Sequence, residues 1–259
     1  MSLAIKILVT FFAGMGAGLG TGFAGMSAAA VITPMLVTFL KVEPYMAVGI
    51  ALSSDVLASA ISAYTYGRNK NLDIKNGSVM MVSVLAFTVV GSFVASLLPP
   101  KTMGNFSTVM TLLLGFRFLS RPVMTTKQGS LAVSKRSRLI KSIVCGAAIG
   151  MVCGFVGAGG GMMMLLILTS VLGYDLKTAV GTSVFVMTFT ALTGAASHFA
   201  IGGGPDWLIF VLCVVFTLIW ARIAAVIANK AQPKTLNRVT GVVLMLLGIV
   251  ILLFSYLTK

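Results

Sequence analysis

The chain contains the same glycine-rich pattern twice, and this duplication restricts its architecture more than any other feature. The pattern G-x-x-x-G-x-x-x-G-F-x-G begins at Gly14 and again at Gly146, 132 residues later. With one residue inserted in the second half, the correspondence continues in the pairs Leu36 and Leu168, Glu43 and Asp175, Asp73 and Asp206, and Pro100 and Pro233. The two halves are therefore two copies of one structural unit.

The composition places both copies in a membrane. Hydrophobic residues make up 58% of the chain and charged residues 9%, with a mean hydropathy of +1.05, whereas about 25% of the residues in soluble domains are charged. We therefore expect an all-α polytopic membrane protein surrounded by lipid. The basic residues behind the net charge of +14 lie between apolar stretches, where they set topology, so we expect no nucleic-acid partner. The three cysteines have no metal-binding or disulfide spacing, and we expect neither a metal nor a cofactor.

Five apolar segments are predicted in each copy. They span about 3–23, 27–40, 45–66, 77–98 and 103–120, then 139–156, 160–173, 177–201, 207–229 and 236–257. The second segment of each copy has about 14 residues and reaches about 21 Å, less than the roughly 30 Å hydrocarbon core. The first two segments of each copy therefore form either a re-entrant hairpin or two spans with a break. The predicted units are a first transmembrane repeat over 1–122, a basic linker over 123–138 and a second repeat over 139–259.

The basic residues predict the orientation. The region 117–141 has seven Lys or Arg residues and no acidic residue, so it belongs in the cytoplasm. With this region inside, both termini are predicted to lie outside the cytoplasm. Each copy then crosses the membrane an odd number of times, so the second copy runs upside down relative to the first. Such inverted repeats are typical of secondary transporters, which bind substrate near the midplane between broken helices.

The glycine-rich breaks are the predicted substrate site. Each break would bring the N-terminus of a short helix to the midplane, where unpaired backbone N–H groups and the positive end of the helix dipole favour an anion. The two predicted lips are Gly25, Met26, Ser27 and Ala28 in the first copy, and Gly157, Ala158, Gly159, Gly160 and Gly161 in the second. The glycines spaced by four at positions 14, 18 and 22 are instead interpreted as a close-packing helix face.

Hydroxyl and guanidinium groups add candidate substrate ligands. Thr182 and Ser183 can donate hydrogen bonds to an oxyanion, and Ser53 and Ser54 lie at a similar depth in the first copy. The alternative is that these hydroxyls bond to helix backbone. Arg222 is a candidate anion ligand, or else a side chain that extends toward the cytoplasmic interface.

Asp55 and His198 are the candidates for proton coupling. Asp55 is an acid near the middle of the membrane, where ionisable residues are costly and mark functional sites by default. Three roles are open for Asp55: binding a coupling proton, forming a structural pair with Arg222, or facing a cavity without a role in transport. His198 is the single histidine of the chain, and it is either a proton relay or an interfacial or hydrogen-bonded residue.

Several further motifs are shared with a known family. They are Gly157-Ala158-Gly159-Gly160-Gly161, Ala179-Val180-Gly181-Thr182-Ser183, and Pro-Lys-Thr followed by Leu-Leu-Gly late in each half. Together with the duplicated opening, they resemble the sulfite exporter TauE/SafE family over nearly the whole chain. The resemblance implies a bacterial-type inner-membrane transporter of sulfite, sulfoacetate or related organosulfonates, usually in the export direction. The first copy departs from the pattern, because Gly49 is followed by Ile50-Ala51 rather than Thr-Ser, and this leaves the substrate open.

We therefore predict a secondary anion transporter that works by alternating access, with proton coupling as an open option. The nearest alternative is an anion channel of the same architecture. An intramembrane enzyme is disfavoured, because aspartyl chemistry needs two acids and only Asp55 lies near the midplane, so no catalytic residue is assigned. The sequence does not decide between a monomer and a homodimer.

Overall fold

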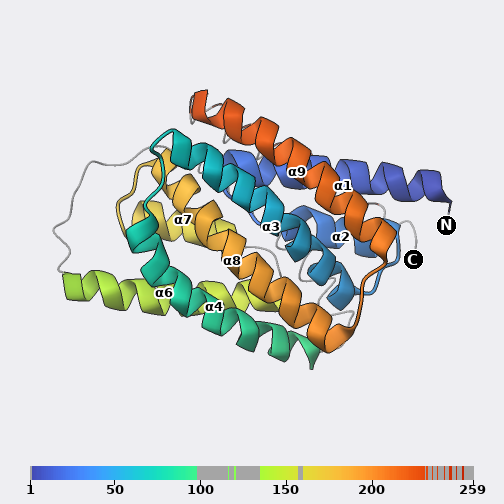
Figure 1. The fold of residues 1–259 in the computed structure, drawn as a ribbon, viewed down its shortest axis with the longest axis horizontal. Coiled ribbons are helices and arrows are strands. Elements are labelled where there is room, and N and C mark those ends of the chain that lie inside the picture. The colour runs from blue at the N-terminus through green and yellow to red at the C-terminus, as the bar shows by residue number, and fades with distance from the viewer. Residues whose placement is uncertain are drawn as a thin grey trace.

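The computed structural model describes residues 2–97, 135–156 and 160–230, and single positions beyond them. Every regular element in these ranges is a helix (Figure 1): α1 (Leu3–Ala24), α2 (Ala29–Phe39), α3 (Pro44–Arg68), α4 (Ile74–Ser96), α6 (Lys135–Val156), α7 (Gly160–Ser170), α8 (Leu176–Gly202) and α9 (Trp207–Lys230). Each helix corresponds to one predicted segment. The predicted segments 103–120 and 236–257 lie outside the described residues.

Helix lengths follow the prediction, with one shifted start. In the part of the chain that the structure describes, five helices are long and apolar enough to cross a membrane, namely α1, α3, α4, α8 and α9. In contrast, α2 and α7 have 11 residues each, or about 16 Å, which confirms that the second segment of each copy is too short to span the hydrocarbon core. Helix α6 begins at Lys135, within the predicted linker 123–138. Lys and Arg are good helix formers, so a run of basic residues does not by itself mark where a helix begins.

An acidic side chain caps the N-terminus of each of four long helices. The Glu43 carboxylate accepts hydrogen bonds from the Tyr45 and Met46 amides at 3.0 and 2.8 Å. Asp73 and Asp175 each accept one from the amide three residues later, both at 3.1 Å, and Asp206 accepts from the first turn of α9 at 3.0 and 3.3 Å. Such caps satisfy amides that have no partner within the helix. The four caps form two repeat-related pairs, at the starts of α3 and α8 and of α4 and α9.

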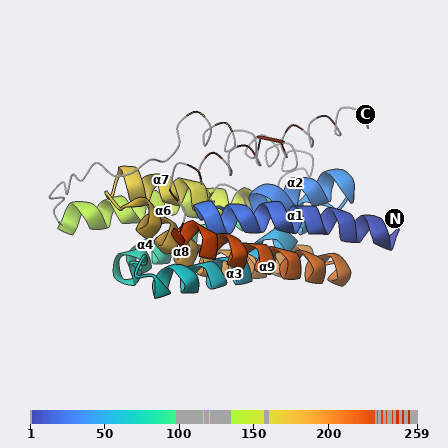
Figure 2. The same ribbon diagram turned by 90° about the horizontal axis from the view of Figure 1, so that it is seen from above.

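The helices of the two copies interleave. Helix α1 packs along α9, α4 packs along α6, and α3 packs against α8 in the middle. Figure 2 shows α1, α2, α6 and α7 in one layer and α3, α4, α8 and α9 in the other, so each layer contains helices of both copies. Helices α3 and α8 are antiparallel, because the ring of Tyr45 at the start of α3 lies beside Gly202 at the end of α8.

Glycines spaced by four allow the closest of these contacts. A Cβ atom added to Gly14 would lie 2.6 Å from the Phe216 Cβ, one added to Gly18 would lie 2.6 Å from the Thr217 carbonyl oxygen, and one added to Gly22 would clash equally with α9. Gly146, Gly150 and Gly154 on α6 meet α4 in the same way. Small residues let two helix backbones approach this closely. The interpretation of the four-spaced glycines as packing residues is confirmed.

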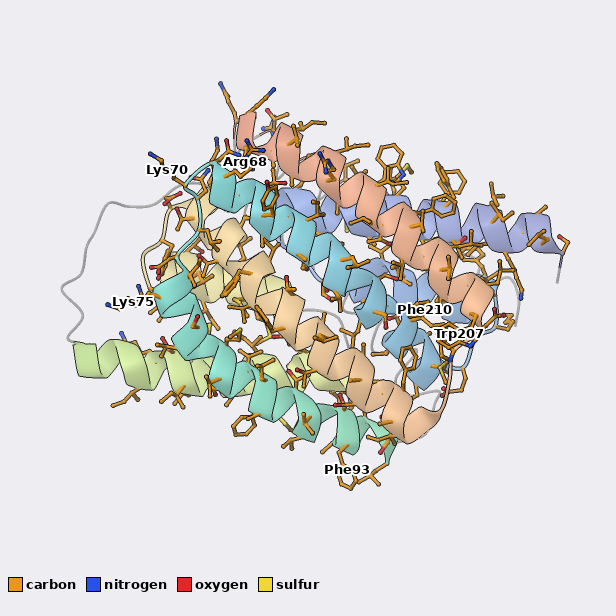
Figure 3. The ribbon with its side chains drawn as sticks, viewed as in Figure 1. Arg68, Lys70, Lys75, Phe93, Trp207 and Phe210 are labelled. Carbon is orange, nitrogen blue, oxygen red and sulfur yellow. The ribbon has the colours of Figure 1, made fainter. Side chains whose placement is uncertain are left out.

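Side chains on the outside of the bundle suit a bilayer. Large apolar side chains such as Leu8, Val82 and Val211 are more than half exposed. The basic residues Arg68, Lys70 and Lys75 lie at the end of the bundle where α3 leads into α4, and the aromatic residues Trp207 and Phe210 lie toward the opposite end (Figure 3). In membrane proteins, basic residues gather on the cytoplasmic side, and aromatic residues are enriched at both membrane–water interfaces.

Candidate functional site

The first helix break is built by Gly25. Helix α1 ends at Ala24, and Gly25 takes the left-handed conformation (φ 63°, ψ 31°) that commonly terminates a helix. Its amide donates to the Thr21 carbonyl at 2.9 Å, and the Met26 amide donates to the Gly20 carbonyl at 3.3 Å. The chain then turns through buried residues to α2, where the Ala29 amide donates to Ser27 Oγ at 3.3 Å. Residues 25–28 therefore separate two helices inside the protein.

The second break meets the first one. Helix α6 ends at Val156 and α7 begins at Gly160, while the predicted site residues Gly157, Ala158 and Gly159 lie outside the described residues. A Cβ atom added to Gly161 would clash with the Gly25 carbonyl oxygen and would lie 3.0 Å from the Ser27 amide nitrogen. The first turn of α7 thus packs directly on the first break, which only a residue without a side chain allows.

Ser183 on α8 connects the two breaks. Its hydroxyl lies 3.3 Å from the Gly25 carbonyl oxygen and 3.2 Å from the Gly161 carbonyl oxygen, and donates to them. Ser183 is fully buried, so this hydroxyl belongs to the contact between the copies. Of the hydroxyl groups proposed from the sequence, it is the one that the structure brings to both breaks.

The other proposed ligands lie elsewhere. The Thr182 hydroxyl accepts from the Asp73 amide at 3.1 Å, at the start of α4. Ser53 and Ser54 donate to carbonyls of their own helix at 2.9 and 3.0 Å, as the backbone-bonding alternative predicts. Arg222 is exposed on α9, whereas residues at both breaks are buried. The spacing of these residues along the chain could not show which face of the helix each one occupies.

Asp55 lies on α3 against the start of α2. Its side chain is fully buried, and Ser59 Oγ donates to Oδ1 at 2.8 Å. The Ser27 side chain and the Ala28 backbone amide also face the carboxylate, but Oδ2 has no hydrogen bond of good geometry within the described residues. No ion pair joins Asp55 to Arg222 in the described part of the chain. The carboxylate therefore occupies the N-terminal end of α2.

Cys153 is close to both Asp55 and α7, which the sequence did not suggest. It is buried within electrostatic range of Asp55, and a Cβ atom added to Gly160 would lie 3.0 Å from the Cys153 Cβ. On α6, Cys153 is one residue before Gly154, the last glycine of the four-spaced series. Its position one turn before the break was the only available signal.

His198 is buried in a contact among four helices. Its Nδ1 lies 3.2 Å from the Tyr45 carbonyl oxygen and its Nε2 lies 2.9 Å from the Gly154 carbonyl oxygen. The Tyr45 hydroxyl donates to the Ser92 carbonyl, and Ser92 Oγ donates to the Gly154 carbonyl, both at 3.3 Å. His198 is 1% exposed, which supports the hydrogen-bonded alternative over the interfacial one. Helices α3, α4, α6 and α8 meet at this network.

The chemistry offered at the breaks is that of backbone dipoles and hydroxyls. Two short helices begin there, and the N-terminal end of a helix dipole favours negative charge. Among the described residues, no group of three His, Cys, Asp or Glu side chains could hold a metal ion. The described groups at the breaks are therefore backbone amides and carbonyls, hydroxyls and the Asp55 carboxylate.

Comparisons with known proteins identify relatives of the chain. The family model described as sulfite exporter TauE/SafE matches residues 10–251. Among curated proteins, the probable membrane transporter protein YunE of Bacillus subtilis is 26% identical, with 96% of each chain covered. The probable membrane transporter protein MJ0441 of Methanocaldococcus jannaschii is also 26% identical, over 97% of this chain and 96% of its own length. No solved structure matches the chain.

Proposed function

This chain belongs to the sulfite exporter TauE/SafE family and is a multi-pass membrane transporter, and from that premise we propose that it moves a small sulfur-containing anion by alternating access. Sulfite, sulfoacetate and other organosulfonates are the proposed substrates, and export is the proposed direction. The observation that carries the proposal is the meeting of the two helix breaks, where Gly161 packs on Gly25 and Ser183 bonds to both.

The proposed binding site is the start of α7. Its first residues, Gly160 and Gly161, are buried, and a helix N-terminus in a buried setting attracts an anion more strongly than one in water, because the local dielectric constant is lower. Gly157, Ala158 and Gly159 would complete the second lip, with Ser183 as the neighbouring hydroxyl. Met26, Ser27 and Ala28 form the opposite lip.

Alternating access follows from an inverted repeat, which we propose for the two copies. In support, exchanging each helix for its copy turns the α1–α9 pairing into the α6–α4 pairing and leaves the α3–α8 pairing unchanged. Helices α1 and α6 run in opposite directions in Figure 1, as do α3 and α8. Two copies related in this way can rock against each other around a site held between them.

We propose that the end of the bundle carrying Arg68, Lys70 and Lys75 faces the cytoplasm, in the inner membrane of a bacterial-type cell. The start of α1 lies at the other end, where Lys6 donates to Asp206 at 2.8 Å. This orientation supports a non-cytoplasmic N-terminus, and the predicted number of segments gives a non-cytoplasmic C-terminus.

Proton coupling is proposed for Asp55, with His198 as the second candidate. Asp55 is a buried acid beside the breaks, and an ionised carboxylate there would repel the substrate anion. Binding of a proton would remove that repulsion, so protonation of Asp55 and binding of the anion would be coupled. His198 contacts Gly154, which immediately precedes the second break, and its protonation state would change that contact.

Reconstituted protein provides the test. Binding and liposome uptake of sulfite, sulfoacetate and thiosulfate would be compared with acetate as the carboxylate control, using the wild type, Gly160→Leu and the matched control Gly204→Leu. A Cβ at Gly160 would lie 3.0 Å from Cys153, whereas Gly204 has open space around it. We expect Gly160→Leu to lose anion binding and Gly204→Leu to keep it. Equal binding by the two variants would contradict the proposed site.

The same vesicles separate a transporter from a channel. An imposed proton gradient should drive the anion uphill in the wild type, and Asp55→Asn should remove the dependence of transport on pH. Purely downhill flux would favour an anion channel of the same architecture. If pH dependence survives in Asp55→Asn, Asp55 is not the coupling residue and His198 becomes the residue to examine.

A further inference from the structure

The chain has five acidic residues, and the carboxylate of each one lies at the N-terminal end of a helix. Four of them are conventional caps, at the starts of α3, α4, α8 and α9. The fifth, Asp55, lies in the middle of α3, but its carboxylate faces the first turn of α2. In this chain, acidic side chains are therefore used to place negative charge at the positive end of a helix.

Asp55 on α3 places its carboxylate at the N-terminal end of α2. It is fully buried, it is held by Ser59 at 2.8 Å, and its Oδ2 atom is unbonded within the described residues. The Ser27 side chain and the Ala28 amide face it at the first break. These are the groups that a substrate anion would use on the first lip, so the carboxylate already takes the place of an anion there.

The second copy has no such carboxylate. The residue 132 positions after Asp55 is Met187 on α8, which is also fully buried. A Cβ atom added to Gly160 would lie 3.7 Å from the Met187 sulfur, so this side chain lies at the start of α7. The two short helices thus begin beside equivalent residues, one an acid and the other an uncharged thioether.

We infer that Asp55 and Met187 together determine which half of the protein binds the substrate anion. In its ionised form Asp55 serves as the anion of α2 and excludes a second anion from the first lip, while Met187 leaves the start of α7 free of negative charge. The substrate then binds at the start of α7 and not at the start of α2, one anion per protein. The inference rests on the proposed anion-transport function and names the residue pair that restricts binding to one copy.

A reciprocal substitution tests the inference. Met187→Asp would place a second carboxylate at the start of α7, and Met187→Asn is its matched control, with the same shape and no charge. Sulfite binding at pH 8 would be measured by calorimetry on detergent-purified protein, with helix content and elution volume as checks of folding. We expect Met187→Asp to bind at least about 100-fold more weakly than Met187→Asn, because a like charge within a few ångströms costs several kcal/mol and the two side chains otherwise have the same shape.

A second variant keeps the test decisive if Met187→Asp fails to fold. Asp55→Asn removes the fixed anion, and we expect sulfite to bind at least about tenfold more tightly or with two anions per protein, because the repulsion is gone and the first lip is free. An unchanged or weaker affinity with one anion would overturn the inference.

The outcomes also separate the two proposals. Sulfite binding that is equal in the wild type and Met187→Asp, or lost equally in Met187→Asn, overturns the role of the residue pair and leaves the transporter proposal standing. Absence of binding of any tested sulfur oxyanion to the wild type overturns the proposed function, and the inference with it.

Discussion

Tyr66 on α3 and His198 on α8 bond to equivalent glycines from equivalent positions. The Tyr66 hydroxyl donates to the Gly22 carbonyl at 3.1 Å, and His198 Nε2 lies 2.9 Å from the Gly154 carbonyl oxygen. Both pairs of residues are 132 positions apart in the sequence. Each glycine lies in the last turn before a break, where a carbonyl has no partner within its helix. The same contact is thus present in both copies, made by a tyrosine in the first and by a histidine in the second.

Removal of the tyrosine hydroxyl should destabilise the protein. Tyr66→Phe leaves the buried Gly22 carbonyl without this donor, and we expect a loss of about 1–3 kcal/mol in the free energy of unfolding, measured as a lower Tm in detergent. Tyr64→Phe is the control, since Tyr64 is 61% exposed. Equal Tm values for the two variants would show that the hydroxyl contributes nothing.

His198 should hold its ring proton on one nitrogen. A neutral imidazole has a single N–H and cannot donate to both the Gly154 and the Tyr45 carbonyls, so the shorter contact at 2.9 Å predicts the Nε2–H tautomer. Because the chain has one histidine, ¹⁵N-histidine labelling gives a single ring to assign by NMR. The Nδ1–H tautomer in the neutral ring would contradict this geometry.

A single methyl group added at Gly18 should disrupt the packing of α1 against α9. In Gly18→Ala the new Cβ would lie 2.6 Å from the Thr217 carbonyl oxygen and 2.7 Å from the Ala221 amide nitrogen, and backbone atoms cannot move aside as a side chain can. We expect the free energy of unfolding to fall by about 1–3 kcal/mol or more, which would be seen as a lower Tm and a less monodisperse protein. Gly204→Ala, with no atom within 4 Å, should behave like the wild type.

The proposed orientation predicts which loops react with an impermeant thiol reagent. In a background without the native cysteines, Gly204→Cys between α8 and α9 should be labelled from the periplasmic side of intact spheroplasts. Asn69→Cys between α3 and α4 should react only after the membrane is opened. Both positions are exposed, so accessibility within the protein is matched. The reverse pattern would invert the topology.

The ion pair at the start of α1 and α9 should make a small, pH-dependent contribution. The hydrogen bond from Lys6 holds the pKa of Asp206 below its usual value. A carboxyl group whose pKa is lower in the folded state than in the unfolded state stabilises the folded protein at pH values above its pKa in the unfolded state. This contribution is lost as the pH falls through the pKa of the folded state. Since both side chains are partly exposed, we expect Lys6→Ala to cost about 0–1 kcal/mol near pH 7.

Thermal unfolding at several pH values measures this difference. The Tm gap between the wild type and Lys6→Ala should close under acid conditions, while Lys75→Ala at the opposite end should show no such trend. A gap that persists in acid would mean that Lys6 acts through packing rather than through the charge of Asp206.

The sequence predicted those features of the site that depend on local chain properties. Helix length and apolar composition are set by neighbouring residues, so the short helices α2 and α7 and the break at residues 25–28 were predictable. The glycines spaced by four occupy one helix face because of the helical period, and the duplication gave the correspondence between Asp55 and Met187. Each of these is a property of one segment or of the repeat.

Contacts between segments required the tertiary structure. Thr182 and Ser183 are neighbours in sequence, yet one bonds at the start of α4 and the other bridges the two breaks. The exposure of Arg222, the burial of His198 and the contact between Asp55 and α2 likewise depend on how each helix is rotated and which helix packs beside it. A hydrophobic segment determines that the chain crosses the membrane as a helix, because every backbone N–H and C=O group must be hydrogen-bonded inside the bilayer. Which side chains then meet is decided by the close packing of helices from both copies, to which residues far apart in sequence contribute.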